Sequence, residues 1–352
     1  MSSTHATIQV GLVGFGIAGR CFHAPVIRAV PGLRLSAILQ RSGNTAAEVY
    51  PDVRVVPTVE DLLALDEVGL VVVATPNTTH AGIARRCLEA GRHVVIDKPF
   101  APTASDAAPL IELARQTGRL LSVYHNRRWD GDFLTVQRLL ADGACGRPVM
   151  FESHFDRYRL GLRPGVWRER AEPGSGVLFD LGSHLVDQAV ALFGLPEAVT
   201  ADVRLEREGA VVDDAFEVML HYPRMRALLR GTMLACEPGP RFVLHGTNGT
   251  YVKRHVDPQE ERLKAGETAG GAGWGQEPSD RWGTLTRCSG GDAVRELVAT
   301  AAGDYRGYYE NIRDVIHGRA TLAVTPQQAL EVVRLLELAQ ESSRQRRTVT
   351  VK

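Results

Sequence analysis

The sequence of 352 residues predicts an α/β protein in two parts, a parallel sheet followed by a largely antiparallel sheet. Up to Tyr124, short apolar runs alternate with helical patterns, which is typical of strand–helix–strand units. Beyond about Arg147, strand patterns follow one another with short turns and one strong helix. The chain is long enough for two domains with separate cores, and we place the boundary between residues 125 and 126.

The elements of the first part follow the glycine-rich start of the chain. Strands are expected at 8–13, 33–39, 55–57, 69–74, 93–96 and 120–124, and helices at 59–64, 79–90 and 105–117. Thr78 or Thr79 is expected to cap the second of these helices. A further helix begins near Ile17, and Pro25 should divide it into two pieces that meet near His23.

The second part is expected to hold strands at 149–155, 199–206, 215–222, 227–234 and 242–246. Helices are expected at 182–193, 308–317 and 326–343, and the last is a candidate for packing back on the first domain. The stretch 257–282 is rich in Gly, Glu and Pro, and it carries Trp274 and Trp282. It is expected to be a long loop, and its length indicates a flap over a site.

The composition argues against several classes of protein. The chain is 44% hydrophobic and 23% charged, and its 41 basic residues balance 41 acidic ones. Without a basic stripe, we expect neither nucleic acid nor an anionic membrane as a partner, and no apolar run is long enough to span a bilayer. Five scattered cysteines without C-x-x-C spacing indicate reduced thiols. With a short polar N-terminus that lacks a signal peptide, they predict a cytoplasmic protein.

A glycine motif follows the first expected strand. Gly14 allows a tight turn, Gly16 lets the backbone approach a pyrophosphate, and Gly19 lets the next helix press against the sheet. That helix directs free N–H groups at the phosphates. A glycine-rich turn that binds nothing is the alternative, but the strand before it and the helix after it favour a dinucleotide site. The residues of this site are Gly14, Phe15, Gly16, Ile17, Ala18 and Gly19.

The end of the second strand bears on the choice of coenzyme. An NAD site usually offers an acidic residue there for the ribose 2′-hydroxyl, but residues 38–43 contain none. Arg41 can bind a 2′-phosphate with a fork of hydrogen bonds, and Ser42 can donate another. The alternative is that Arg41 is a solvated surface residue. The missing acid and the arginine together predict NADP(H) in preference to NAD(H).

Two groups of residues carry the expected chemistry. Lys98, in Asp97-Lys98-Pro99, directly follows a buried strand and should project from the ligand edge of the sheet, with a cis peptide before Pro99 as one option. Asp180 and His184 lie four residues apart, so one helical face should present both. The carboxylate can orient the imidazole that moves a proton. The alternatives are a surface lysine, and for the pair an N-cap aspartate with a core histidine, or a metal pair. No third metal ligand is evident, and no metal is expected.

Together these residues resemble the Gfo/Idh/MocA family of nicotinamide-dependent oxidoreductases, and the match runs from Val10 to the last helix. The parts that match are residues 14–19, Ala74-Thr75-Pro76-Asn77 with His80, 97–99, Trp167-Arg168 and 180–184. Asp97 is a departure, since family members usually carry glutamate there. Residues 19–25, 125–133, 151–158 and 257–260 are similar to a narrower branch, the NADP-dependent scyllo-inositol dehydrogenases.

The resemblance implies a Rossmann domain at 1–125 and a substrate-binding domain at 126–352 with a large, mostly antiparallel open sheet. It implies a homodimer or homotetramer that assembles through that sheet. It also implies that Lys98, Asp180 and His184 lie at the reacting carbon. Further residues expected near the cofactor are Thr75, Pro76, Asn77, His80, Asp97, Lys98, Asn126, Trp167 and Arg168, and Asp156 and Tyr158 are further expected substrate contacts.

The expected function is NADP-dependent hydride transfer between nicotinamide and a secondary alcohol, or its ketone, on a cyclic polyol or sugar. His184 is the first choice for acid–base catalysis, with Asp180 orienting it or binding a neighbouring hydroxyl. Lys98 would hydrogen-bond the reacting oxygen, and it is the other candidate to carry the proton. Two alternatives remain on the same fold, an NAD-dependent redox-cycle glycosidase and a non-catalytic dinucleotide-binding regulator.

Overall fold

The computed structural model describes residues 6–163, 165–289 and 292–352, so most of the expected polar N-terminus lies outside the described residues. The chain forms two compact units. The first contains the described residues up to Asn126, together with Gln259–Trp274 and Asp304–Leu330. The second contains Arg127–Pro258, Gly275–Gly303 and Glu331–Lys352 in its described parts. Each unit therefore collects segments that lie far apart in the sequence.

The first unit is built on a six-stranded sheet in which all neighbouring strands are parallel. Its strands are β1 Ile8–Val13, β2 Leu33–Leu39, β3 Arg54–Val56, β4 Val68–Val73, β5 His93–Ile96 and β6 Leu121–Val123. Their order, β3-β2-β1-β4-β5-β6, reverses direction between β1 and β4. Ligands bind beyond the carboxyl ends of the strands at such a reversal. The expected parallel sheet is confirmed.

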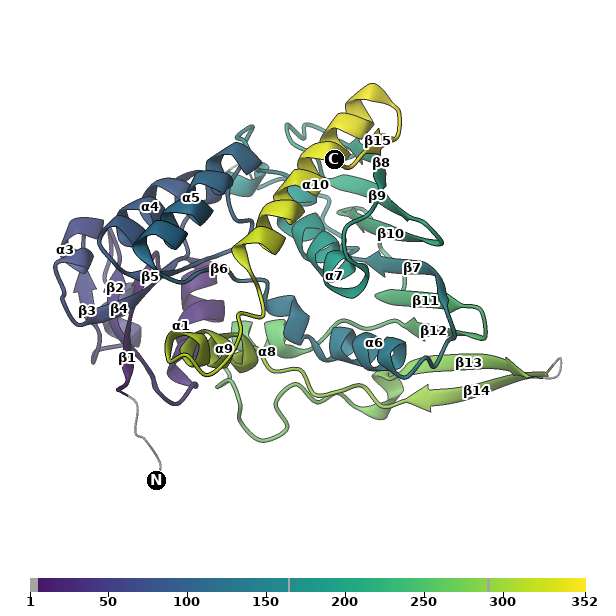
Figure 1. Ribbon diagram of the computed structural model, residues 1–352, viewed down its shortest axis with the longest axis horizontal. Coiled ribbons are helices and arrows are strands. Elements are labelled where there is room, and N and C mark those ends of the chain that lie inside the picture. Colours follow the sequence, from purple (N-terminus) through teal and green to yellow (C-terminus); the bar gives the residue numbers. More distant parts are fainter. Residues whose placement is uncertain (1–5, 164, 290–291) are drawn as a thin grey trace. The chain divides into compact units, whose positions relative to one another are not determined.

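Helices cover both faces of this sheet. Figure 1 shows α4 (His80–Glu89) and α5 (Ala104–Thr117) on one face and α1 (Ala24–Arg28) and α9 (Arg306–Ile316) on the other. The other helical segments are η1 Ala18–His23, α2 Thr45–Val49, α3 Val59–Leu63, η2 Asn77–Thr79, η3 Asn126–Trp129 and α8 Gln259–Lys264. η1 is a π-helix, and it meets α1 between His23 and Ala24, where Pro25 led us to expect the division.

The helix starts show where local rules apply. Thr103 caps α5 by accepting a hydrogen bond from the backbone N–H of Asp106, and Gly118 ends that helix with a φ of 63°. Thr79 occupies the N-cap position of α4, but its side chain makes no capping bond. Its hydroxyl instead donates to the carbonyl oxygen of Pro76. The expected cap position at Thr79 is confirmed, but the side-chain hydrogen bond that usually accompanies it is not formed.

The second unit is built on a nine-stranded sheet ordered β14-β13-β12-β11-β7-β10-β9-β8-β15. Neighbouring strands are antiparallel except β7 and β10, which confirms the expected character of the sheet. The strands are β7 Pro148–His154, β8 Ala198–Arg204, β9 Ala215–Tyr222, β10 Met225–Thr232, β11 Phe242–Gly246, β12 Gly249–Lys253, β13 Gly283–Ser289, β14 Asp292–Val298 and β15 Val349–Thr350. The last four were not expected from the sequence.

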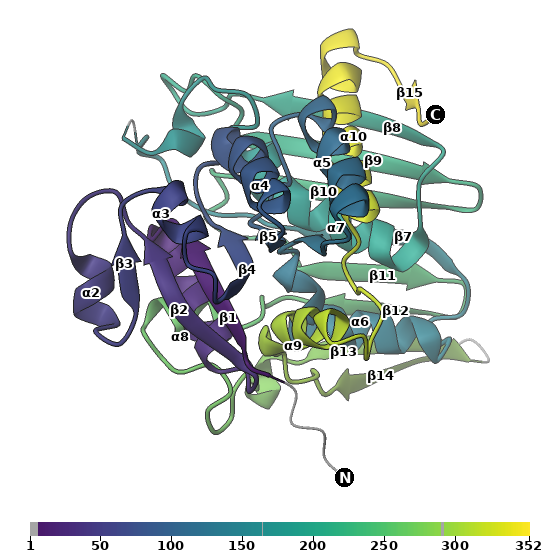
Figure 2. The same cartoon turned by 60° about the vertical axis from the view of Figure 1, so that its left-hand side comes forward.

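Helices cover one face of this sheet. Figure 2 shows α6 (Gly131–Ala141), α7 (Ser183–Phe193) and α10 (Pro326–Gln345), of which α10 begins in the first unit. Phe151 and Phe242 of the sheet form one core with Leu185 of α7 and Leu336 of α10. Shorter helical segments are η4 Trp167–Glu169, η5 Leu178–Gly182 and η6 Ser279–Arg281. In the described part of the chain, the opposite face carries no helix.

No described helix has both the length and the apolar character that a membrane crossing needs.

One expectation for the second half of the chain needs correction, and one helix was not predicted. Residues 257–282 are not one loop, because they contain α8 and η6, and Trp274 is buried with its indole N–H donating to Gln259 Oε1 at 3.1 Å. Helix α6 was also missed. Its first N–H, from Gly131, is bound by the Asp257 carboxylate at 2.7 Å, so its start depends on a residue 126 positions away.

Candidate active site

The three motif glycines lie in the turn between β1 and η1 and meet different surroundings. Gly14 has a φ of +100°, and a Cβ there would lie 2.6 Å from the carbonyl oxygen of Ala74. A Cβ on Gly19 would lie 2.2 Å from the carbonyl oxygen of Gly14. A Cβ on Gly16 would meet nothing within 4 Å. The fold itself therefore requires Gly14 and Gly19, whereas Gly16 leaves open space that fits the close approach of a pyrophosphate.

The turn after β2 is held by Gln40. Its side-chain amide donates to the carbonyl oxygen of Ser42 at 2.8 Å, and its side-chain oxygen accepts the backbone N–H of Ala46 at 2.8 Å. Arg41 and Ser42 are both exposed at this carboxyl end of the strand. The turn contains no carboxylate and carries an exposed guanidinium, a group that can bind an anion through several hydrogen bonds.

The loop after β4 carries Thr75, Pro76, Asn77 and His80. His80 is buried, with Nδ1 at 3.0 Å from the carbonyl oxygen of Pro99 and Nε2 at 2.9 Å from that of Thr75. Burial lowers the pKa of His80, although the nearby Asp97 carboxylate acts in the opposite direction. Both ring nitrogens are used inside the fold, so His80 joins this loop to the strand end that carries Lys98.

Lys98 is the second residue after β5 and is partly exposed, whereas Asp97, which follows the strand directly, is buried. The Asp97 carboxylate accepts the backbone N–H of Lys98 at 2.9 Å, and the Lys98–Pro99 peptide is cis. Parallel strands place their following loops at one edge, so the glycine turn, Arg41, Thr75 and Lys98 all belong to the carboxyl edge of this sheet. Asn126, which is buried, begins the segment after β6.

A second group of predicted residues lies in the second unit. Arg168 Nε donates to Asp180 Oδ1 at 3.0 Å, and its guanidinium stacks over the ring of Trp167 at 4.6 Å. Asp180 lies in the π-helix η5, and His184 is buried in the first turn of α7. The expectation of one regular helix through both residues is therefore wrong, because the helix type changes between Gly182 and Ser183.

Asp213 holds the start of η5 and was not found by sequence reasoning. Its carboxylate accepts the N–H of Leu178 at 2.7 Å, and its backbone carbonyl accepts the N–H of Val177 at 2.9 Å. Burial raises the pKa of Asp213 to about 6, although hydrogen bonds from the backbone N–H groups of Leu178, Asp213 and Val177 act in the opposite direction. The adjacent acids Asp213 and Asp214 before a strand were the available signal, but the helix that Asp213 caps begins 35 residues earlier.

The two further expected substrate contacts occupy different settings. Asp156 accepts the backbone N–H of Gly239 at 3.0 Å, so this carboxylate supports a neighbouring loop. Tyr158 is 58% exposed and pairs with Leu234 only through an isolated bridge. Its phenol is therefore available to a ligand, whereas Asp156 already has a structural partner.

Comparisons with known proteins decide the family. Residues 8–125 match a family model described as "Oxidoreductase family, NAD-binding Rossmann fold", and residues 137–351 match one described as "Oxidoreductase family, C-terminal alpha/beta domain". The chain belongs to the Gfo/Idh/MocA family of oxidoreductases. Its first unit therefore contains a Rossmann domain for a nicotinamide cofactor, and the space beside Gly16 fits that group.

Similar Gfo/Idh/MocA proteins extend over the whole chain. The uncharacterised oxidoreductase YdgJ of Escherichia coli is 46% identical and covers 97% of this chain and 98% of its own. The scyllo-inositol 2-dehydrogenase (NADP(+)) IolW of Bacillus subtilis is 37% identical, covering 97% and 96%. Among solved structures, the yvaA protein of Bacillus subtilis, described as an oxidoreductase, has a TM-score of 0.95 at 36% identity and covers 99% of both chains.

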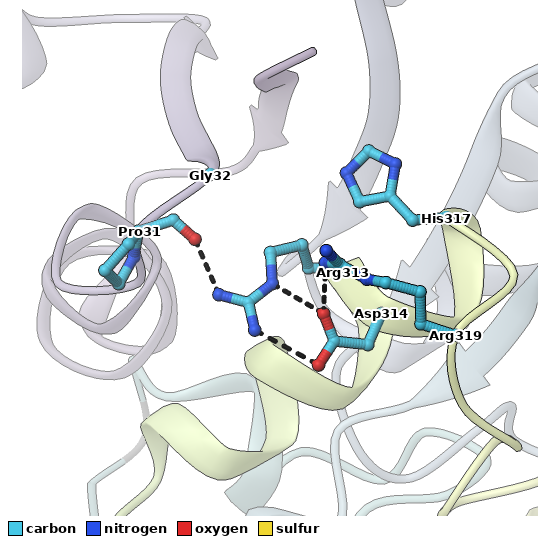
Figure 3. Close-up of a pocket in the computed structure, with 6 residues that line it drawn as sticks. All are labelled: Pro31, Gly32, Arg313, Asp314, His317 and Arg319. Atoms are coloured by element: carbon cyan, nitrogen blue, oxygen red, sulfur yellow. Dashed lines mark hydrogen bonds and ion pairs between the residues drawn. The ribbon is translucent and has the colours of Figure 1, made fainter. Parts of the chain in front are cut away.

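A surface hollow of about 550 Å³ in the Rossmann unit of this Gfo/Idh/MocA protein lies away from the predicted residues. Figure 3 shows Arg313 reaching between Pro31 and Asp314. It donates to the carbonyl oxygen of Pro31 at 2.7 Å and to the Asp314 carboxylate, which also accepts a bond from Arg319. These arginines already have partners, so the hollow is not a second anion site. Among the described residues, no group of three or more His, Cys, Asp or Glu side chains is placed to hold a metal ion.

Proposed function

We propose that this oxidoreductase transfers hydride between NADP(H) and a secondary alcohol, or the corresponding ketone, of a cyclic polyol or sugar. The observation that carries the proposal is the carboxyl edge of the six-stranded sheet, where the open space at Gly16, the acid-free turn at Arg41 and the partly exposed Lys98 belong together. The similarity to IolW, an NADP-dependent scyllo-inositol 2-dehydrogenase by name, supports the polyol as substrate class.

The chain's own residues would move the proton and hold the substrate. When bound, the nicotinamide supplies or accepts the hydride. In alcohol oxidation, His184 takes the hydroxyl proton at a ring nitrogen, and in ketone reduction it returns that proton to the same oxygen. Lys98 donates a hydrogen bond to the reacting oxygen. Asp180, fixed by its bond from Arg168, accepts a hydrogen bond from a neighbouring hydroxyl of the ring.

A substrate screen tests this function. Purified protein is mixed with inositols, sugars and their ketones while NADPH absorbance is followed, and at least one cyclic polyol or its ketone should be turned over. Lys98→Met and His184→Ala should each lower turnover about 10²–10⁴-fold, the usual contribution of general acid–base groups, and should change NADPH affinity much less. Absence of turnover across the panel would refute the proposal. A cofactor that stays bound while glycosides are hydrolysed would instead indicate the redox-cycle glycosidase.

We also propose that copies of the chain associate through the open face of the nine-stranded sheet. Pairing registers place one row of side chains across that face: Thr200, Met219, Leu228, Glu152, Val243, Val252, Thr284 and Leu297. Five of these eight are apolar, and Leu297 at the end of the row is 63% exposed. Apolar surface of this kind favours a homodimer or homotetramer.

We further propose that the protein is cytoplasmic. All five cysteines are free, which supports this proposal.

A further inference from the structure

His23 is a fully buried histidine of η1 that the proposed chemistry does not use. Its Nδ1 lies 2.6 Å from the hydroxyl oxygen of Tyr309 on α9. Its Nε2 lies 3.6 Å from Asp97 Oδ1, the same oxygen that accepts the backbone N–H of Lys98. One line of polar groups therefore runs from Tyr309 through His23 and Asp97 to the backbone of Lys98, all within the first unit.

The hydroxyl group of Tyr309 and the carboxylate of Asp97, on either side of His23, indicate which ring nitrogen carries the hydrogen. Burial raises the pKa of Tyr309 well above its usual range, so the phenol keeps its proton and can donate a hydrogen bond to Nδ1. A neutral imidazole with Nδ1 as acceptor carries its hydrogen on Nε2. That N–H faces the carboxylate of Asp97. The other neutral tautomer would direct a nitrogen lone pair at the carboxylate instead.

Aromatic rings keep His23 in this orientation. The ring of Tyr124 packs on the imidazole with a centroid distance of 4.3 Å, and Tyr309 packs on Tyr124 at 5.4 Å. The hydroxyl of Tyr124 donates to the carbonyl oxygen of Phe22, next to His23. A buried ring packed in this way has little freedom to turn. The direction of Nε2 towards Asp97 is therefore fixed by packing as well as by Tyr309.

The carboxylate of Asp97 is charged despite its burial. Burial alone would raise the pKa of Asp97, but the hydrogen that His23 directs at the carboxylate and the nearby ammonium group of Lys98 act in the opposite direction and bring it below its usual value. A buried carboxylate needs such partners to remain ionised. Aspartate is shorter than the glutamate usual in the family, and here its oxygen stays beside the next backbone N–H while His23 approaches from the other side.

We propose that Tyr309, His23 and Asp97 act as positioning residues for Lys98, holding the strand end that presents its ammonium group to the substrate. The inference rests on the proposed function, because it assigns a purpose to Lys98. It also gives a role to the histidine in the stretch 19–25, which followed the glycine motif in the sequence without a function of its own.

Kinetics of two neighbouring tyrosines test the proposal. Tyr309→Phe removes the hydroxyl that binds His23, and kcat should fall about 3- to 10-fold, the effect of one lost buried hydrogen bond, with the Kd for NADPH unchanged. Tyr308→Phe is the matched control, because Tyr308 is equally buried but donates to Ser122 Oγ at 2.9 Å instead. Its kcat should stay within about twofold of wild type. Equal losses in both variants would overturn the proposal.

Substitutions of His23 separate positioning from packing. His23→Leu fills similar space without either nitrogen, and His23→Gln restores a donor towards Asp97. Turnover should rank wild type, then glutamine, then leucine. Without the N–H of His23, the pKa of Asp97 should rise, so the acid limb of the kcat profile should move to higher pH in the leucine variant. A purely structural role predicts equal activity for leucine and glutamine and an unmoved acid limb, and that result would overturn the proposal.

A spectroscopic readout keeps this test independent of turnover. In ¹H–¹⁵N spectra of the histidine rings, assigned with His23→Gln, His23 should be the neutral tautomer protonated at Nε2. Tyr309→Phe should shift the Nδ1 signal, and Tyr308→Phe should not. A proton on Nδ1 in the wild type would overturn the chain from Tyr309 to Asp97. Failure of the proposed function would appear differently, as the expected spectra in a protein that turns over no polyol.

Discussion

At the scale of single residues, the three glycines of one turn are needed for different reasons. Gly14 and Gly19 avoid collisions within the protein, and Gly16 leaves space for a ligand. Local reasoning from the spacing of Gly14, Gly16 and Gly19 predicted all three positions, because each role depends on close approach within a short stretch of chain. Residues with distant partners were not predictable in this way. Asp213 caps a helix 35 residues before it, and Tyr309 binds a histidine 286 residues away. No local pattern encodes such pairs.

The open space at Gly16 leads to a prediction about folding and binding. Gly16→Val should leave stability nearly unchanged and abolish NADP(H) binding, because a Cβ at this position meets nothing within 4 Å and the side chain would occupy the space that a pyrophosphate needs. Gly19→Val should instead unfold or strongly destabilise the protein, since its Cβ would lie 2.2 Å from a backbone oxygen. Thermal unfolding and calorimetric titration with NADPH would check both. Intact binding in a folded Gly16→Val protein would contradict the assigned role.

The exposed guanidinium after β2 leads to a prediction about coenzyme preference. A charge-assisted bond from Arg41 to a 2′-phosphate is worth about 1.5–3 kcal/mol, so kcat/KM should favour NADP over NAD by roughly one to two orders of magnitude. Arg41→Ala should reduce that ratio, and Arg41→Asp should reverse it by repelling the phosphate. Arg54→Ala, which changes an exposed arginine of β3, serves as a control. A wild-type preference for NAD would show that the turn has been misinterpreted.

At the scale of elements, two π-helices contain or adjoin residues that the sequence analysis singled out. η1 follows the glycine turn and η5 carries Asp180, and each continues directly into an α-helix. π-Helical turns are rare and frequently lie at functional sites. The sequence indicated a helical start at both places, but spacing alone does not distinguish i→i+4 from i→i+5 bonding. In η5 the choice depends on tertiary partners such as Asp213, which local patterns do not contain.

The cap of η5 leads to a prediction about pH. The pKa of Asp213 is about 6 in the folded protein against an ordinary 3.8, so the folded state holds a proton that the unfolded chain releases between these values. This carboxyl group therefore lowers the free energy of unfolding as pH rises from about 4 to about 6. Asp213→Asn keeps an oxygen for the N–H of Leu178 and removes the buried charge. Its stability relative to wild type should improve by about 1–3 kcal/mol over that range.

Urea unfolding of both proteins at about pH 4 and about pH 7 measures this change. Asp202→Asn is the control, because Asp202 is exposed and its pKa is lowered by the bond from Arg204. That variant should show no gain in relative stability as pH rises. A constant difference between wild type and Asp213→Asn would mean that this carboxyl group titrates as an ordinary aspartate.

At the scale of the whole molecule, the sequence predicted the two kinds of sheet but not how the chain is shared between the units. Strand–helix alternation is local, so the parallel sheet was predictable strand by strand. The return of Gln259–Trp274 and Asp304–Leu330 to the first unit depends on long-range packing. Inside that unit, Trp274 and the backbone N–H of Tyr305 both bind the side-chain oxygen of Gln259, which joins the two returning segments.

The apolar row across the open sheet face leads to a prediction about assembly. Leu297→Glu places a charge at the exposed end of the row, so the protein should dissociate towards smaller species in light scattering at micromolar concentration. Val294→Glu is the matched control, because Val294 is 59% exposed on the same strand but is paired with Arg287 on the opposite face. An unchanged mass for Leu297→Glu together with Leu228→Glu would exclude this face as the interface.

The 286-residue separation between His23 and Tyr309 also has a consequence for synthesis. A ribosome makes the glycine turn well before it makes α9, because His23 and Tyr309 are 286 residues apart. When the glycine turn has just been made, two later segments of the first unit are still missing. The imidazole of His23 then lacks the hydroxyl group of Tyr309 as its hydrogen-bond partner. A fragment released before α9 cannot complete the chain of polar groups to Lys98. The surroundings of Lys98 are therefore complete only after α9 has been synthesised.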